Sequence, residues 1–165
     1  MEEAYGAGQA RALGVSNFYP DRFIDIATFS TVKPAVNQLE AHVFQQRKID
    51  RPFLEKYGCQ MEAWGPFAEG KNNFFANETL QAIGGKYGKS VAQVALRFLV
   101  QSGIVVIPKS ARKERMAENF AIFDFVLSAD DMGIIEAMDT GKSLFFSHSD
   151  PETAERYMAL AQQGL

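Results

Sequence analysis

Apolar residues along the chain follow two kinds of pattern, and the first kind predicts buried strands. Four short runs are rich in β-branched or aromatic residues. Strands of a parallel sheet are covered on both faces, so they read as nearly continuous apolar runs. The predicted strands are residues 12–17, 35–39, 60–66 and 104–107.

The second pattern, apolar positions at helical spacing, follows each of these runs. Pro20 suits the first turn of a helix, Ser90 can cap a helix start, and Gly103 can end one. Ser128 and Asp131 have the spacing of a capping box. The predicted helices are residues 21–29, 50–57, 78–87, 90–101, 111–120 and 128–138, with a last helix that begins at Asp150–Pro151.

The alternation of strands and helices predicts an α/β fold with a parallel sheet. Such a sheet needs helices on its faces or closure into a barrel. A complete (βα)8 barrel of the TIM type takes about 250 residues, and four βα units make half of one. We therefore expect residues 1–165 to form a single partial domain, with 141–165 as a C-terminal tail that contains a helix. Further units are expected upstream.

Composition and charge exclude several classes of partner. The 165 residues are 47% hydrophobic and 22% charged, as in ordinary globular domains. A net charge of −3 gives no global field for nucleic acid or an anionic membrane. The longest mostly apolar run, 91–100, is shorter than the ~20 residues that a bilayer requires. Cys59 is the one cysteine, and no stretch resembles a signal peptide, so we expect a cytoplasmic protein.

One local cluster of positive charge interrupts this acidic chain. Lys109, Arg112, Lys113 and Arg115 follow the fourth predicted strand at the start of a helix. Such a cluster is often only a solvated helix face. However, the loops after the last strands of a (βα)8 barrel commonly bind phosphate, and helix N-termini favour anions. We therefore interpret the cluster as an anion site with Lys109 and Arg115 as its main cations.

Polar residues also gather at the end of the second predicted strand. Asn37, Gln38 and Glu40 lie where burial is expected, and buried polar groups need partners. A binding site at the carboxyl end of this strand would explain them. Trp64, on the third strand, reads from its apolar surroundings alone as a core residue. His42 and His148 lack ligand-spaced companions, so no metal site is predicted.

Several segments together resemble the aldo/keto reductase family. They are ALGVSNF (12–18), PAVNQLEAH (34–42), EAWGPF (62–67), GKSVAQVALR (88–97), IPKS (107–110), ER (114–115), EN (118–119) and FDF (123–125). The resemblance runs from about residue 8 to residue 140 in the family's order and spacing. It implies strands five to eight of the family's barrel, its C-terminal half, with residues 2–8 as the end of the fourth helix.

The resemblance also implies where NADP would bind. Ser16, Asn17 and Gln38 match the contacts to the nicotinamide carboxamide, and Trp64 matches the aromatic platform below the ring. Lys109, Ser110 and Arg115 match the residues that bind the 2′-phosphate, which favours NADP over NAD. The other implied positions are Gly65, Pro66, Phe67 and Gly70 at the pyrophosphate, Ile107 and Pro108 before Lys109, and Glu118 and Asn119 at the adenine. Gly65 departs from the serine that many relatives have, which puts one phosphate contact in doubt.

The implied activity is NADPH-dependent reduction of a small carbonyl substrate, an aldehyde or a ketone, to an alcohol. The family's catalytic tyrosine, lysine, aspartate and histidine lie on the first four strands. The five tyrosines present, Tyr5, Tyr19, Tyr57, Tyr87 and Tyr157, lie outside the matching motif, so we assign no catalytic residue and expect the chain alone to be inactive.

Two other functions remain open at this stage. The chain could be a non-catalytic nucleotide-binding or assembly remnant of the same fold, or a different half-barrel that binds a sugar phosphate. An unclosed sheet would leave its first and fourth strands as edges. We therefore expect self-association, or complementation by a separate N-terminal half.

Overall fold

The computed structural model describes residues 1–164, and its centre is a parallel sheet. The strands lie in the order β1-β2-β3-β4, and all three pairings are parallel. Ser16 pairs with Gln38, which in turn pairs with Glu62. The strands are β1 (Gly14–Ser16), β2 (Val36–Glu40), β3 (Gln60–Trp64) and β4 (Val105–Val106). The predicted α/β class with a parallel sheet is therefore confirmed.

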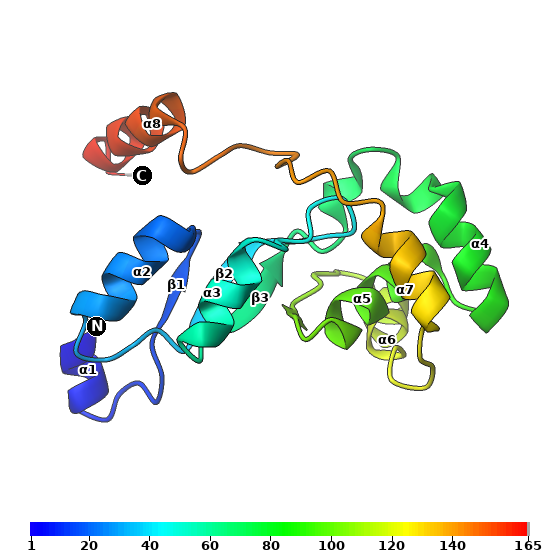
Figure 1. Cartoon of the computed structure of the whole chain (residues 1–165), viewed down its shortest axis with the longest axis horizontal. Helices are drawn as coiled ribbons and strands as arrows, with labels where there is room; N and C mark the ends of the chain where they lie inside the picture. Colours follow the sequence, from blue (N-terminus) through cyan, green and yellow to red (C-terminus); the bar gives the residue numbers. More distant parts are fainter. Residues whose placement is uncertain (165) are drawn as a thin grey trace.

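The helices occupy the predicted segments, with small shifts at their ends. Figure 1 shows α2 and α3 beside the first three strands, α4 to α7 gathered in a second region, and α8 apart at the end of a long extended segment. The helices are α1 (Glu2–Gly6), α2 (Pro20–Phe29), α3 (Asp50–Lys56), α4 (Glu78–Tyr87), α5 (Val91–Gln101), α6 (Lys113–Phe120), α7 (Ala129–Glu136) and α8 (Pro151–Gln162).

Backbone geometry explains two of the shifted boundaries. The third strand ends at Trp64 and not at Pro66, because Gly65 adopts a left-handed conformation with φ of 62°. The sixth helix begins at Lys113, two residues later than predicted. The Ser110 hydroxyl accepts the Arg112 N–H at 3.1 Å, and this local turn precedes the helix.

The core lies between the sheet and the helices that connect its strands. Leu39 of β2 and Ala63 of β3 are fully buried, as are Phe23 of α2 and Leu99 of α5. Ser90 caps the start of α5, as the sequence predicts, and it does so in a capping box with Gln93. None of the helices within residues 1–164 combines the length and the apolar character needed to cross a bilayer.

An interior glycine of α4 is explained by close packing. A Cβ added to Gly84 would lie 2.3 Å from the carbonyl oxygen of Lys89, and a main-chain atom cannot move aside easily. Helix α4 therefore accepts the poor helix former so that the turn into α5 can fold back tightly. Gly88 closes α4 with φ of 64°.

Asp131 joins α4 to α7 through a buried carboxylate. The Lys86 ammonium and the Tyr87 hydroxyl donate to it, at 2.5 and 2.7 Å, and the Ser128 hydroxyl donates at 2.9 Å. The hydrogen bond from Lys86, followed by that from Tyr87, lowers the pKa of Asp131 below its usual 3.8. The capping-box spacing at Ser128 therefore serves tertiary packing as well as the helix start.

We expect Asp131→Asn to lower the free energy of unfolding by about 1–3 kcal/mol, the cost typical of a broken buried charged hydrogen bond. A carboxyl whose folded pKa is depressed stabilises the fold above its unfolded pKa and stops doing so as the pH falls through the folded value. The difference in the free energy of unfolding between the wild type and Asp131→Asn should therefore shrink below pH 3.8. Urea denaturation at neutral and acid pH measures it. Asp130→Asn, at an exposed neighbour, should change little; equal losses for both variants would contradict the account.

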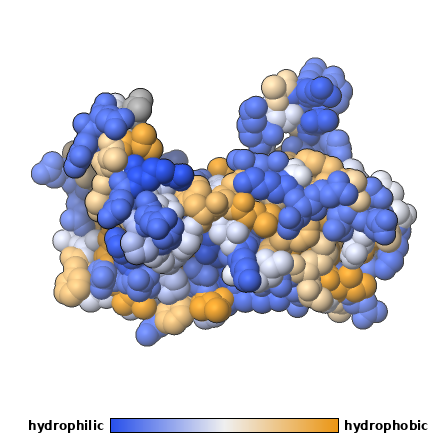
Figure 2. All heavy atoms as spheres, turned by 90° about the horizontal axis from the view of Figure 1, so that it is seen from above, coloured by the Kyte–Doolittle hydropathy of each residue, from blue (hydrophilic) through white to orange (hydrophobic). Residues whose placement is uncertain are grey.

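Strands β1 and β4 are the outer strands of the described sheet, as predicted. Figure 2 shows apolar residues exposed among polar ones on one face of the molecule. Val105 of β4 and Ile107 beyond it are both exposed. An edge of this kind offers unpaired backbone groups and apolar side chains to another chain segment.

Candidate cofactor site

The candidate site is built from segments that follow the four strands. Because the strands are parallel, these segments meet at the carboxyl edge of the sheet, where ligands bind in open α/β sheets and barrels. Three cavities line this edge. They account for most of the residues that the sequence assigned to a cofactor.

At the end of β1 and β3, the residues assigned to the nicotinamide bind one another. The Trp64 indole N–H donates to Asn17 Oδ1 at 2.7 Å, and Asn17 Nδ2 donates to Ser16 Oγ at 3.2 Å. Asn17 adopts a left-handed conformation with φ of 61°, which turns its side chain toward Trp64. Gln38 Nε2 instead donates to Glu62 Oε1 at 2.6 Å. The structure thus brings Ser16, Asn17 and Trp64 together. Gln38 lies beside the carboxylate of Glu62, a residue that was not assigned to the site from the sequence.

A cavity of about 220 Å³ lies next to this group. Ser16 lines it from β1, Asn17 from just after β1, Arg22 from α2, and His148 from the tail. Burial, followed by the nearby Arg47 charge, lowers the pKa of His148 below 6.5, which favours its neutral ring. The contribution of His148 was not expected from its isolated position in the sequence.

The loop after β3 forms a second cavity of about 320 Å³. Three consecutive residues of the loop, Ala68, Glu69 and Gly70, have φ of 51°, 48° and 77°. Its lining includes the assigned residues Gly65, Pro66, Phe67, Gly70, Ile107 and Lys109. Glu69 and Phe75 line it as well and were not anticipated from the sequence. A carboxylate at Glu69 would repel a bound pyrophosphate if both faced the same space.

The cation cluster after β4 forms a third cavity of about 440 Å³. The assigned residues Lys109, Ser110, Arg115, Glu118 and Asn119 all line it. Arg112 and Lys113 are exposed and do not line it, so two of the four clustered cations lie at the cavity. The Glu118 carboxylate accepts a hydrogen bond from the Ser90 hydroxyl and keeps its negative charge, so two cations and one carboxylate line this cavity.

The second and third cavities share Phe67, Phe75 and Lys109, and therefore adjoin each other. The shared lining connects Gly65 at the end of β3 to Asn119 on α6. Lys109 lies where the two cavities adjoin, and Arg115 lines the third cavity alone. Pro108 lies just before Lys109 and lines neither cavity.

The buried polar residues of β2 form hydrogen bonds mainly within the chain, although Asn37 Oδ1 and Glu40 Oε2 have no hydrogen-bond partner among the described residues. Asn37 Nδ2 donates to the Phe18 carbonyl at 2.6 Å. Glu40 Oε1 interacts with His42 Nε2 at 3.0 Å and accepts the Leu144 N–H at 3.0 Å. Burial raises the pKa of Glu40, but hydrogen bonds from His42, Ser143 and Leu144 outweigh it, so the net pKa lies below 4.5. Asn37 and Glu40 therefore organise loops, and only Gln38 of the predicted polar group lies among the site residues.

The cysteine and the buried histidine noted in the sequence have structural roles in this fold. Cys59 is 5% exposed, and burial raises the pKa of its thiol to about 11, so the reactive thiolate is scarce at neutral pH. His42 is fully buried in its pair with Glu40. Within residues 1–164, no three His, Cys, Asp or Glu side chains gather in a group able to hold a metal ion.

Comparisons with known proteins agree with this architecture. Residues 1–140 match the aldo/keto reductase family. The chain is 40% identical over 140 residues to aldose reductase B of Dictyostelium discoideum, covering 85% of this chain and 45% of that protein. It is 42% identical over 139 residues to glyoxal reductase of Bacillus subtilis, covering 84% of this chain and 50% of that protein. It thus spans about half the length of these curated relatives.

Solved structures show the same similarity. An aldo-keto reductase from a Medee basin deep-sea metagenome library superposes with a TM-score of 0.87 at 36% identity, covering 90% of this chain and 55% of that one. An aldo-keto reductase of the silkworm Bombyx mori, solved with NADPH, has a TM-score of 0.80 at 35% identity, covering 86% of this chain and 46% of that one. The match over residues 1–140 and the parallel sheet lead to one conclusion: the chain belongs to the aldo/keto reductase family.

Proposed function

We propose that this chain supplies the NADP-binding half of an aldo/keto reductase barrel that reduces aldehydes or ketones to alcohols. The observation that carries the proposal is the pair of adjoining cavities after β3 and β4. Gly65 lines the first of the two and Arg115 the second, and Phe67 and Lys109 line both. Relatives named as aldose and glyoxal reductases, and a neighbour solved with NADPH, support the activity and the cofactor.

Each assigned residue has a binding or orienting role in this proposal. Lys109 and Arg115 form charge-assisted hydrogen bonds with the 2′-phosphate, and the N–H groups at the start of α6 add a favourable dipole. Ser16, Asn17 and Gln38 orient the carboxamide, and Trp64 provides the stacking surface. Bound NADPH supplies the hydride; the chain's residues only bind and orient the cofactor.

The proton donor of the reaction is proposed to lie on the four strands that would complete the barrel. The half-barrel arrangement is supported by the two outer strands of the sheet and by the 45–50% coverage of the curated relatives. We propose that the exposed edges at β1 and β4 bind this complementary half. A cytoplasmic location belongs to the same proposal and is consistent with a buried, unpaired Cys59.

A cofactor titration tests the proposed function. We expect NADPH to bind this chain more tightly than NADH, because only NADPH carries the 2′-phosphate that Lys109 and Arg115 would bind. Isothermal calorimetry with the two cofactors measures the difference. Equal affinities would contradict the assignment and would favour a site for simple phosphates or sugar phosphates.

A further inference from the structure

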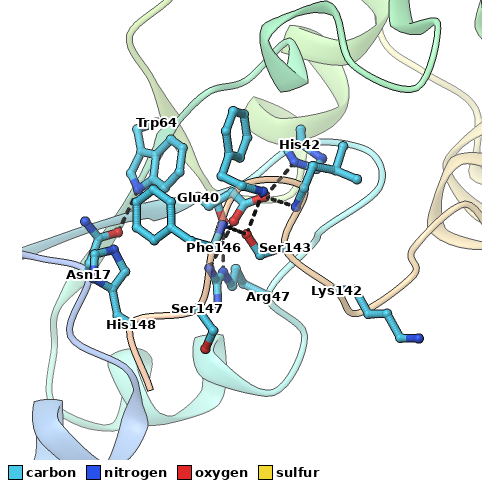
Figure 3. A network of polar contacts seen from close by, with 12 residues as sticks. Asn17, Glu40, His42, Arg47, Trp64, Lys142, Ser143, Phe146, Ser147 and His148 are labelled. Carbon is cyan, nitrogen blue, oxygen red and sulfur yellow. Dashed lines mark hydrogen bonds and ion pairs between the residues drawn. The ribbon is translucent and has the colours of Figure 1, made fainter. Parts of the chain in front are cut away.

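The tail after α7 crosses the proposed nicotinamide end of the site. Figure 3 shows Phe146 beside the indole of Trp64, with Asn17 and His148 close by. The Phe146 ring lies 6.3 Å from the Trp64 ring at an interplanar angle of 24°, an offset stack. Phe145 contacts the same indole at 5.1 Å and 60°. Aromatic rings of the tail therefore occupy the neighbourhood in which a nicotinamide would stack.

Polar contacts on both sides hold this segment in place. Glu40 Oε1 accepts the Leu144 N–H at 3.0 Å, and this carboxylate is itself fully buried. On the other side, Lys71 Nζ donates to the Leu144 carbonyl at 2.9 Å and lies 3.9 Å from the centre of the Phe145 ring. Ser143 Oγ accepts the N–H groups of the two phenylalanines at 3.0 Å, which fixes the turn that presents both rings.

We propose that residues 143–146 form a strap that covers Trp64, and that Glu40 is the positioning residue that holds the strap there. A nicotinamide can then stack on Trp64 only after the strap has moved. This inference rests on the proposed role of Trp64 in cofactor binding. It also gives the buried Glu40 a role beside the site, because Glu40 accepts the Leu144 N–H.

The strap affects one end of the site only. Within the described chain it makes no hydrogen bond to Lys109, Ser110 or Arg115, and none of its residues lines the cavity that these three form. A ligand that carries only the adenosine and its phosphates should therefore bind without displacing the strap. The whole dinucleotide should have to displace it.

The test compares 2′,5′-ADP with NADP⁺ on the wild type and on Phe146→Ala, Glu40→Gln and the control Phe29→Ala. Phe29 is exposed at the end of α2, far from Trp64 in sequence and outside the site cavities. We expect 2′,5′-ADP to bind all four proteins equally. Phe146→Ala should bind NADP⁺ about two- to tenfold more tightly than the wild type, the range that one aromatic pair supports. Glu40→Gln should act in the same direction but more weakly, because its amide oxygen can still accept the Leu144 N–H.

A second measurement uses Trp64 itself, which is the one tryptophan of the chain. Without ligand, Phe146→Ala and Glu40→Gln should make its fluorescence easier to quench with acrylamide, whereas Phe29→Ala should not. Unchanged quenching in Phe146→Ala would overturn the strap. Unchanged or weaker NADP⁺ binding by that variant, with 2′,5′-ADP bound normally, would overturn the competition. If 2′,5′-ADP binds none of the proteins, the proposed function is wrong, and the quenching alone decides whether the strap covers Trp64.

Discussion

Purified alone, this chain should show no measurable reduction of 4-nitrobenzaldehyde by NADPH. General acid catalysis contributes roughly 10²–10⁴-fold to such reactions, and the positioning of reactants contributes several kcal/mol more. In our account the proton donor and the wall that positions the carbonyl both lie on the complementary half. Cofactor binding is then the most that the residues at Trp64 and Lys109 can provide.

Loss of NADPH absorbance with time measures this turnover. The comparison is the same chain extended by, or mixed with, an upstream half of the barrel, and turnover should appear in both cases. Appearance on mixing would support the proposed pairing of the edges at β1 and β4. Robust turnover by the short chain, abolished by Trp64→Ala or Lys109→Ala, would reveal an acid catalyst in this half and contradict the account.

Removing either cation of the third cavity should weaken NADPH binding about ten- to a hundredfold, the effect of one charge-assisted hydrogen bond. The variants Lys109→Ala and Arg115→Ala should leave NADH binding much less affected, because NADH lacks the 2′-phosphate. Calorimetric titration of both cofactors provides the measurement.

Two neighbouring cations serve as matched controls for these variants. Arg112 and Lys113 belong to the same charged cluster but do not line the cavity, so their alanine variants should retain most of the affinity. Losses that are equal for NADPH and NADH, or equal across all four cations, would show that only the general positive charge matters.

The sequence predicted the fold well where local pattern decides the structure. The strand at 60–64 and the helix at 78–87 depend on nearby apolar spacing and on caps such as Ser90. The residues at the carboxyl edge of the sheet were also predictable, because a parallel topology brings the ends of successive strands together. The resemblance to a family then named individual positions among them, such as Lys109 and Arg115.

The tail shows why other parts could not be predicted. The hydrogen bond between Glu40 and Leu144 joins residues 104 positions apart, and no local pattern indicates such a contact. The sequence placed a helix in the tail but gave no role to Phe145 and Phe146 before it. Two adjacent aromatic residues in a polar tail were the available signal. Similarly, the polarity of Asn37 and Glu40 indicated a ligand site, whereas both bind loops of the same chain.

NADP binding along the carboxyl edge of this sheet can be measured by hydrogen–deuterium exchange with and without NADPH. We expect slower amide exchange in two segments, residues 65–71 after β3 and residues 107–119 from β4 into α6. The α3 helix, Asp50–Lys56, lines none of the three site cavities and should exchange as before. NADPH binding that leaves both segments unchanged, or that protects a different surface, would contradict the account.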